Sequence, residues 1–226
     1  MSGSPLIGIF GGTFDPVHVG HLQIAEQIRD AAGLNAVYFI PAGEPRLRSA
    51  PVASARDRSA MVSAAIKSNP GFLLDECEST RRDTSYTIDT LRELKQRLGE
   101  HTTLCFIIGA DAFQKLAGWR DWEELFRLCH FIIADRPGHH LATPGNRMLS
   151  DKILEAACAE RWVLAADDLR KAPDGLIFVA PATLTDISST TIRARIDAGK
   201  SIRYLVPDTT LDYINNHQLY TKPGAV

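Results

Sequence analysis

The sequence lacks several features that would place the protein in other classes. No apolar stretch approaches the ~20 residues that a membrane-spanning helix needs. The segment Met1–Pro5 has no basic stretch followed by a long apolar one, so we expect no signal peptide. With 25 Lys and Arg against 27 Asp and Glu, the net charge is −2, and no global positive field attracts nucleic acid or an anionic membrane. Any binding of phosphate must therefore come from a local site.

Cysteine is also scarce, and its spacing excludes the common metal motifs. The sequence has 4 cysteines, which lie far apart and form no C-x-x-C pair: Cys77, Cys105, Cys129 and Cys158. Cys105 and Cys129 lie in or beside apolar runs typical of strands. We therefore expect buried, reduced thiols rather than a metal site or disulfides, and we expect a cytoplasmic protein.

The chain shows no internal repeat and no low-complexity tract. Its 226 residues, with 45% apolar and 23% charged residues, are ordinary for a soluble globular protein. This length suits one large domain with a sizeable core. We expect a single domain over residues 1–226, whose helical C-terminal part, about residues 188–217, completes the functional site.

Apolar runs alternate with amphipathic segments along the chain. We expect strands at Leu6–Phe10, Ala36–Ile40, Phe72–Leu74, Leu104–Ile108, His130–Ala134 and Leu176–Val179. We expect helices near Gly20–Ala32, Ala55–Ser68, Tyr86–Leu98, Arg147–Glu160, Ser188–Ala198 and Asp208–Asn216. This alternation predicts an α/β fold of the Rossmann-like, doubly wound type, with a mainly parallel sheet and helices on both faces. In such sheets ligands bind beyond the carboxyl ends of the strands. Four segments directly follow predicted strands: Gly11-Gly12, the Pro41–Ser54 loop, Gly109–Asp111 and Arg136.

The segment from Gly11 to His21 carries the strongest functional signal. Two adjacent glycines, Gly11 and Gly12, let the backbone approach a ligand where a side chain would collide. We expect a tight glycine turn here, followed by a helix whose free N–H groups and positive dipole end suit a phosphate. His18 and His21 are three residues apart, so both imidazoles are expected on one face near that end. This is the layout of a nucleotide phosphate site.

Two better-known phosphate loops are excluded. The Walker A loop ends in Gly-Lys-Ser/Thr, and the first lysine of this chain is Lys67. The dinucleotide fingerprint needs G-x-G-x-x-G, whereas this turn reads Gly8-Ile9-Phe10-Gly11-Gly12 and continues with bulky residues. Histidines thus occupy the place where those loops put a lysine or bare backbone.

A second motif lies near the C-terminus, at Ile187–Arg193. Ser188 and Ser189 are good helix N-cap residues. Arg193 follows Ser189 by four positions and lies one turn further on the same face. Amides, hydroxyls and a guanidinium would then converge on one anion, although the run alone is equally typical of a capped surface helix.

Together the two motifs resemble those of the HxGH nucleotidyltransferase superfamily and, more narrowly, of the bacterial nicotinate-nucleotide adenylyltransferases. The resemblance runs from about Ile7 to the C-terminus and includes Ser85–Leu91, Gly109–Asp111 and Arg136–Gly138. The Tyr86–Leu91 segment and Trp119 favour the nicotinate branch over pantetheine-phosphate or glycerol-phosphate relatives. The resemblance implies transfer of AMP from ATP to nicotinate mononucleotide in NAD biosynthesis, giving nicotinate adenine dinucleotide and pyrophosphate, with Mg²⁺ accompanying ATP.

The resemblance also implies residue roles. It puts His18 and His21 on the ATP phosphates, assisted by Arg193 from the late helix. It implies ATP or phosphate contacts for Gly11, Gly12, Thr13, Phe14, Arg48, Gly109, Asp111, Ser188 and Ser189. It implies nicotinate-nucleotide contacts for Tyr86, Thr87, Trp119, Arg120 and Arg136. Trp119 would stack on the pyridine ring, and backbone amides near Thr87 and Arg120 would bind the nicotinate carboxylate.

One segment departs from the family pattern. The loop after the second strand often reads Pro-Pro-His-Lys/Arg in this family, whereas here it is Pro45-Arg46-Leu47-Arg48. The basic position survives as Arg48, but leucine replaces the histidine.

The expected chemistry is charge stabilisation rather than covalent catalysis. An anionic phosphate must attack a second anion, so positioning and electrostatics dominate, and we expect no enzyme nucleophile. Nearby phosphates would favour the charged, doubly donating form of His18 or His21. We expect Mg²⁺ to be held chiefly by substrate and water, and the chain shows no carboxylate cage for it.

Other readings remain open at this point. The acceptor could be nicotinamide mononucleotide, phosphopantetheine or a sugar or lipid phosphate. The chain could also be a nucleotide sensor without turnover, although intact His18, His21 and Arg193 count against that. A tRNA-synthetase fragment is disfavoured by the near-neutral charge and the lack of a lysine-rich loop. Trp119, taken alone, is more typical of a core residue. Expected partners are small molecules, without nucleic acid or membrane, and a homo-oligomer stays open.

Overall fold

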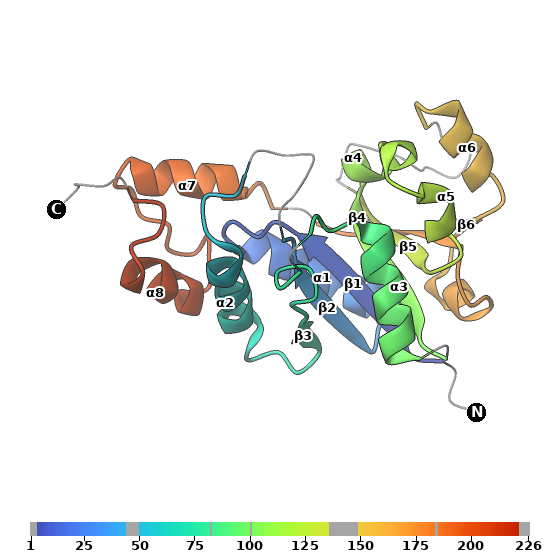
Figure 1. Ribbon diagram of the computed structural model, residues 1–226, viewed down its shortest axis with the longest axis horizontal. Helices are drawn as coiled ribbons and strands as arrows, with labels where there is room; N and C mark the ends of the chain where they lie inside the picture. Colours follow the sequence, from blue (N-terminus) through green and yellow to red (C-terminus); the bar gives the residue numbers. More distant parts are fainter. Residues whose placement is uncertain are drawn as a thin grey trace. The chain divides into compact units, whose positions relative to one another are not determined.

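The computed structural model describes residues 4–43, 50–81, 83–99, 101–135, 149–183 and 185–221, in which strands and helices alternate (Figure 1). The strands are β1 (Leu6–Gly12), β2 (Ala36–Pro41), β3 (Phe72–Leu74), β4 (Thr103–Gly109), β5 (His130–Asp135), β6 (Trp162–Val163) and β7 (Ile177–Pro181). The α-helices are α1 (Val19–Ala32), α2 (Ala55–Ile66), α3 (Thr87–Leu98), α4 (Ala110–Phe113), α5 (Trp122–Leu125), α6 (Lys152–Cys158), α7 (Ser189–Asp197) and α8 (Asp208–Asn216). The 3-10 helices are η1 (Leu116–Gly118) and η2 (Ala166–Arg170).

The described strands form one seven-stranded sheet in the order β3-β2-β1-β4-β5-β7-β6. β1 pairs with β4, β4 with β5, β5 with β7, and β6 with β7, each time in parallel. Every residue of β4 except its last is buried, as expected for a strand covered on both faces. The prediction of a Rossmann-like α/β fold is therefore confirmed.

The strands differ from the sequence prediction at two places. β1 continues through Gly12, where the N–H of Ala42 donates to the Gly12 carbonyl at 2.8 Å. Neither Gly11 nor Gly12 has a positive φ, so the predicted tight glycine turn is wrong and the glycine pair extends the strand. The sequence also gives no sign of β6, because two residues carry no periodicity.

The chain divides into two compact units, each assembled from three segments. The first unit contains Met1–Phe10, Ile24–Tyr38 and Tyr86–Leu184. The second unit contains Gly11–Gln23, Phe39–Ser85 and Thr185–Val226. The histidine motif and the late serine–arginine motif both belong to the second unit. The single domain expected over residues 1–226 stays a prediction.

Aromatic rings fill much of the core of the first unit. The ring of Phe131, on β5, lies 5.5 Å from that of Phe113 and 4.8 Å from that of Phe126, measured between centroids. All three side chains are buried. On the surface of the same unit, Arg92 of α3 donates to Glu124 of α5 at 2.6 Å. This ion pair joins α3 to α5 at the surface.

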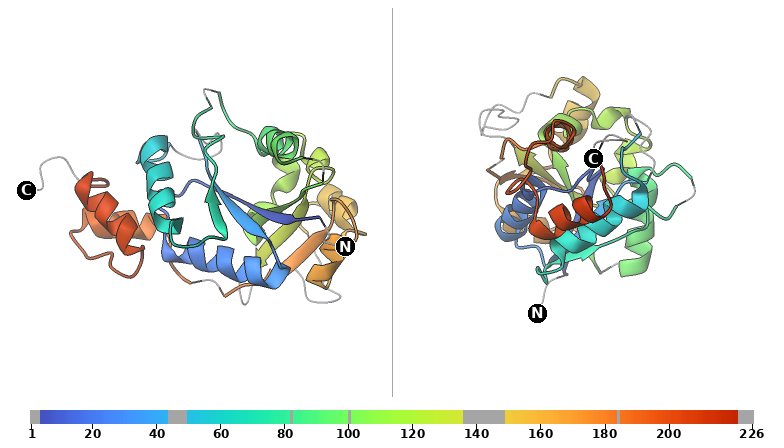
Figure 2. Two further views of the ribbon diagram at one scale, coloured as in Figure 1. Left: turned by 90° about the horizontal axis from the view of Figure 1, so that it is seen from below. Right: turned by 90° about the vertical axis from the view of Figure 1, so that its left-hand side faces the viewer.

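Helices α2 and α8 lie side by side in the second unit (Figures 1 and 2). The hydroxyl of Thr209 donates to the carbonyl of Ala64 at 3.0 Å, and the hydroxyl of Tyr213 donates to Asp57 at 3.0 Å. Ser54 caps α2 by accepting a hydrogen bond from the N–H of Asp57 at 3.1 Å. The C-terminal helix is therefore part of the packing of this unit.

Candidate active site

His18 and His21 lie against each other in the second unit. His18 directly precedes α1, and its carbonyl accepts from the N–H of His21 at 2.9 Å. In return, the N–H of His18 donates to Nδ1 of His21 at 3.3 Å. The two imidazole rings stack with centroids 3.7 Å apart and planes inclined by 25°. The histidine spacing thus produces the predicted pair, and the first hydrogen bond of α1 fixes the two residues relative to each other.

Glycines make room for the side chains that support this pair. A Cβ on Gly20 would stand 3.1 Å from Nδ1 of His18, and a Cβ on Gly12 would stand 2.9 Å from the ring of Phe14. Phe14 is buried with φ of +48° and sets its ring edge against His21 at 5.0 Å between centroids. Unlike Gly12 and Gly20, Gly11 has nothing within 4 Å of an added Cβ. The side chain of Phe14 therefore supports His21 from inside the protein, and Gly11 offers the free backbone.

Burial keeps both histidines neutral in the absence of a ligand. Burial lowers the pKa of His18 from 6.5 to about 4. It also lowers the pKa of His21 well below the usual range, with a further contribution from the neighbouring charge of His18. Since Nδ1 of His21 accepts a hydrogen bond, the ring proton of neutral His21 is on Nε2. Nδ1 of His18 is buried without a hydrogen-bond partner among the described residues.

The late motif contacts the segment between the glycines and the histidines. The hydroxyl of Ser189 donates to the Pro16 carbonyl at 2.9 Å. Nη1 of Arg193 donates to the Asp15 carbonyl at 2.6 Å. Ser188 is the N-cap of α7, as its sequence predicts, and its hydroxyl accepts from the N–H of Thr191 at 3.1 Å. The structure thus brings the two predicted motifs together within one unit.

Asp15 links this arrangement, and sequence reasoning gave it no role. Its carboxylate accepts hydrogen bonds from the N–H groups of Val52 at 2.8 Å and Ala53 at 3.1 Å, and from the hydroxyl of Tyr220 at 2.8 Å. Nη1 of Arg193 lies 3.6 Å from Oδ2 of the same carboxylate. With 4% of its surface exposed, Asp15 is a buried anion satisfied mainly by neutral donors.

Arg58 is a second residue that sequence reasoning missed. It is 1% exposed, and its guanidinium donates to the carbonyls of Thr13 at 2.7 Å, Gly43 at 3.0 Å and Ala53 at 3.3 Å. It ties the segment after β1 to both sides of the Pro41–Ser54 loop. A signal was available, because Arg58 precedes the apolar Met61 by three positions and so lies on the buried face of α2.

The described residues among those predicted for the nicotinate nucleotide lie in the first unit. The guanidinium carbon of Arg120 lies 4.7 Å from the centre of the Tyr86 ring. Trp119 is half-buried, with its ring edge-on to Phe106 at 6.0 Å between centroids. Helix α3 begins at Thr87 without a side-chain cap, which leaves N–H groups of its first turn for another acceptor.

The remaining predicted residues fall in two groups. Gly109 and Asp111 are exposed at the end of β4, and the β4–β5 register sets Gly109 beside Ala134. Arg48 and Arg136 lie outside the described residues, and their roles stay predictions.

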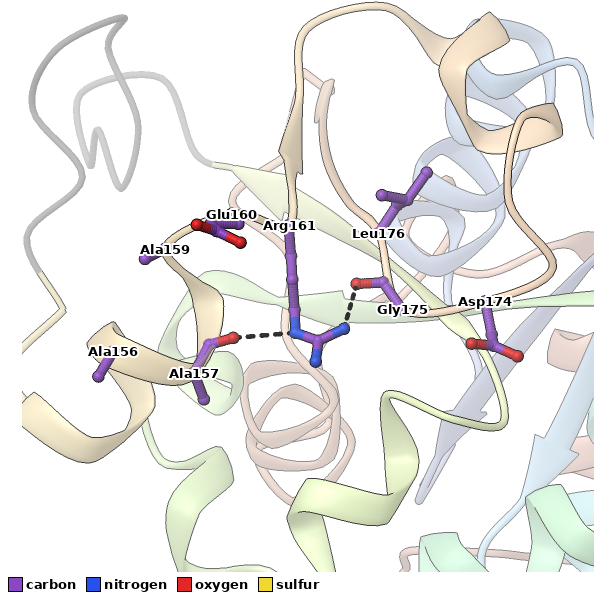
Figure 3. A pocket seen from close by; sticks show the side chains of 8 residues that line it. All are labelled: Ala156, Ala157, Ala159, Glu160, Arg161, Asp174, Gly175 and Leu176. Carbon is purple, nitrogen blue, oxygen red and sulfur yellow. Dashed lines mark hydrogen bonds between the residues drawn. The ribbon is translucent and has the colours of Figure 1, made fainter.

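A separate hollow of about 420 Å³ lies in the first unit, and none of the predicted residues lines it. Arg161 stands in it, and Figure 3 shows its guanidinium held by two backbone carbonyls. It donates to Ala157 at 2.9 Å and Gly175 at 3.2 Å, and it lies 4.8 Å from the centre of the Phe126 ring. Because the guanidinium of Arg161 is bonded to backbone carbonyls, we assign Arg161 a structural role and the hollow no ligand.

Metal-binding clusters, membrane-spanning helices and disulfides are all absent from the described residues. These residues contain no cluster of three or more His, Cys, Asp or Glu that could hold a metal ion. No helix among them has the length and apolar character needed to cross a bilayer. All four cysteines are free thiols, as predicted, but Cys77 is half-buried rather than buried, because it follows β3 in a loop.

Known proteins similar to this chain identify its family. Residues 9–195 match the cytidylyltransferase-like family. A probable nicotinate-nucleotide adenylyltransferase of Hahella chejuensis is 39% identical over 224 residues, covering 99% of this chain and 97% of the relative. One of Stenotrophomonas maltophilia is 41% identical over 219 residues, covering 95% and 96%. The chain belongs to the nicotinate-nucleotide adenylyltransferase family. The predicted resemblance is confirmed.

Solved structures agree on the fold. The nicotinic acid mononucleotide adenylyltransferase of Plasmodium falciparum, complexed with NaAD, aligns with a TM-score of 0.67 at 21% identity, covering 96% of this chain and 97% of that one. A putative nicotinate-nucleotide adenylyltransferase of Vibrio parahaemolyticus aligns with a TM-score of 0.61 at 19% identity, covering 96% and 95%. Both likenesses extend over nearly the whole chain and support the α/β fold described above.

Proposed function

We propose that the chain transfers the adenylyl group of ATP to nicotinate mononucleotide, forming nicotinate adenine dinucleotide and pyrophosphate in NAD biosynthesis. Relatives at 39% and 41% identity bear the name of this activity. The structural observation that supports it best is the stacked pair of His18 and His21. Arg193 is bonded to the segment just before this pair, at the carbonyl of Asp15. Imidazole N–H groups and a fixed guanidinium in the same unit suit an anionic ligand.

In the proposed reaction, a phosphate oxygen of nicotinate mononucleotide attacks the α-phosphorus of ATP. The new bond joins that oxygen to the α-phosphorus, and the bond from the α-phosphorus to the oxygen bridging to the β-phosphorus breaks. Pyrophosphate leaves with the bonding electrons. The protein needs no nucleophile, because positioning and charge stabilisation lower this barrier.

The second unit would bind and neutralise the reacting phosphates. His21 in this tautomer carries its proton on Nε2, and Arg193 keeps donors besides the Nη1 bond to Asp15. An arriving phosphate would raise the pKa of both histidines, since a nearby anion favours the charged imidazole. Protonated His18 or His21 would then stabilise charge that builds on the departing pyrophosphate. Gly11, Gly12 and Thr13 would offer backbone contacts beside them.

The first unit would bind the nicotinate nucleotide. The uncapped first turn of α3 at Thr87 supports binding of the nicotinate carboxylate by backbone N–H groups. Hydrogen bonds to a charged group are worth about 1.5–3 kcal/mol, so such a site favours the acid over the amide. Trp119 would stack on the pyridine ring, with Tyr86, Arg120 and Arg136 around it. Gly109 and Asp111 would face the adenosine.

Magnesium would enter as part of the ATP complex. The described residues provide no acidic cluster for it. The carboxylate nearest the histidine pair in sequence, Asp15, already accepts bonds from Val52, Ala53 and Tyr220. Because these groups do not fit a protein-held metal ion, we assign no catalytic step to one. The free thiols support a reducing compartment, and we propose the cytoplasm.

The decisive experiment measures pyrophosphate release from ATP and Mg²⁺ with three acceptors in parallel. Nicotinate mononucleotide should support fast release, and nicotinamide mononucleotide and phosphopantetheine should not. Preference for either other acceptor would contradict the substrate assignment but keep the mechanism. Binding of ATP without release in any reaction would identify a nucleotide sensor instead.

A further inference from the structure

The carboxylate of Asp15 lies where it could compete with substrate for Arg193. Nη1 of Arg193 is 3.6 Å from Oδ2 of Asp15, beyond the ~2.7–2.9 Å of a charge-assisted hydrogen bond. The same nitrogen donates instead to the main-chain carbonyl of Asp15 at 2.6 Å. The guanidinium is therefore held beside a buried anion without being bound tightly to it.

Other donors occupy the carboxylate and explain this geometry. Oδ1 accepts from the N–H of Ala53 and from the hydroxyl of Tyr220, and Oδ2 accepts from the N–H of Val52. Of these three, the Tyr220 hydroxyl is the only side-chain donor. Burial, followed by the neighbouring charge of Asp15, raises the pKa of Tyr220, so its hydroxyl stays protonated and donating.

An ordered turn after α8 places Tyr220 next to the carboxylate of Asp15. Gln218 and Tyr220 both have positive φ, at +49° and +65°, a conformation that costs a non-glycine residue about 1–3 kcal/mol. The N–H of Leu219 donates to the carbonyl of Ile214 at 3.0 Å, and the hydroxyl of Thr221 donates to the carbonyl of Gln218 at 2.8 Å. The turn is thus ordered against its local backbone preference.

We propose that Tyr220 is a positioning residue for ATP: its hydroxyl satisfies the Asp15 carboxylate, which keeps the guanidinium of Arg193 available for the nucleotide phosphates. Without that hydroxyl, the charge of Asp15 draws Arg193 into a direct ion pair and away from the substrate. The inference rests on the proposed function only in taking Arg193 as a ligand of ATP. It concerns ATP binding rather than the chemical step.

The test compares Tyr220→Phe with wild type by calorimetric titration with MgATP in the absence of the second substrate. The Kd for ATP should rise roughly tenfold, the value of one weakened charge-assisted hydrogen bond. In steady-state assays, KM for ATP should rise similarly, while KM for nicotinate mononucleotide stays within about twofold of wild type.

Tyr213→Phe is the matched control. Like Tyr220, Tyr213 donates its hydroxyl to a carboxylate, but from α8 to Asp57 of α2, at 3.0 Å. It should leave the Kd for ATP unchanged. A double-mutant cycle tests whether the effect of Tyr220 depends on the charge of Asp15. In an Asp15→Asn background, the carboxylate that would draw Arg193 away is gone, so Tyr220→Phe should produce no further loss of ATP affinity.

Several outcomes would overturn the proposal. An ATP Kd for Tyr220→Phe within twofold of wild type would do so, as would equal losses in Tyr220→Phe and Tyr213→Phe. Tyr220→Met is measured alongside; if neither variant folds, the hydroxyl is a folding determinant rather than a positioning group. Failure of the proposed function is recognised separately, because wild type would then bind ATP but release no pyrophosphate with nicotinate mononucleotide.

Discussion

The backbone N–H of His18 donates to Nδ1 of His21 at 3.3 Å, while the two imidazole rings stack 3.7 Å apart. One residue thus fixes the tautomer of the other, and the start of α1 fixes both. The ring of Phe14 packs against that of His21 in a T-shaped arrangement and supports the pair. The geometry of the histidine motif is set by contacts inside the protein before any substrate arrives.

Removing either imidazole should abolish most of the activity while the fold is kept. We expect His18→Ala and His21→Ala each to lower kcat by roughly 10²–10⁴-fold, because each removes a donor to the reacting phosphates. Pyrophosphate release measures kcat, and far-UV circular dichroism checks the fold. His217→Ala is the control, since His217 is exposed and stacks on Tyr213 instead. Near-normal kcat in both variants would contradict the mechanism.

Loss of the Arg193 side chain should lower turnover far more than loss of Arg195, which lies on the same helix. Arg193→Ala should lower turnover by roughly 10²–10⁴-fold through the loss of a fixed guanidinium. Arg195→Ala removes a guanidinium whose nitrogens donate to the carbonyl of Ser201 at 2.9 and 2.7 Å, and it should retain activity close to wild type. Parallel assays of the two variants test this, and similar losses in both would assign Arg193 a structural role.

The neutral histidines should make the ligand-free protein sensitive to acid. Burial lowers the pKa of His18 to about 4 from 6.5, so the unfolded chain binds more protons than the folded one between these pH values. The free energy of unfolding should therefore fall as the pH drops from 6.5 to 4, with at most about 3–4 kcal/mol from His18, at about 1.36 kcal/mol per pKa unit.

Urea titrations of wild type and His18→Asn across this range measure the effect. Carboxylates and the more distant histidines contribute to both proteins, so the difference between the two curves reports His18 together with its electrostatic effect on His21. On acidification, the free energy of unfolding should fall more for wild type than for His18→Asn. Parallel curves would show that His18 titrates normally.

Arg58 should contribute strongly to stability. Arg58→Met removes the donor to the buried carbonyls of Gly43 and Ala53 and to the half-buried carbonyl of Thr13, and each unsatisfied buried group costs about 1–3 kcal/mol. We expect a loss of roughly 3 kcal/mol or more in the free energy of unfolding. Arg56→Met, at an exposed position of the same helix, should stay within about 0.5 kcal/mol of wild type. Denaturant titration measures both, and equal stabilities would contradict the role of Arg58.

Trp119 should affect the second substrate selectively. If its ring stacks on the pyridine, Trp119→Ala should raise KM for nicotinate mononucleotide by about tenfold and leave KM for ATP nearly unchanged. Trp122→Ala is the control, because Trp122 packs edge-on to Phe126 at 6.3 Å between centroids. Normal binding of the pyridine nucleotide by Trp119→Ala would make Trp119 a core residue.

Local signals in the sequence predicted the fold class and the central site residues. The histidine spacing predicted the pairing of His18 with His21, and the serine pair predicted the cap of α7. Apolar runs predicted the buried strands, since a parallel sheet covered on both faces needs them. The same signals failed at Gly11-Gly12, where pairing with the neighbouring strand extended β1.

Tertiary structure alone decided what holds the site together. Tyr220 donates to Asp15 across 205 positions, and Arg58 donates to Thr13 across 45. No periodicity or short motif encodes such a bond, because its partners meet only after the intervening strands and helices have packed. Sequence determined which groups carry the proposed chemistry, namely His18, His21 and Arg193. Folding determined which buried donors and acceptors surround them, because that depends on the closure of distant segments.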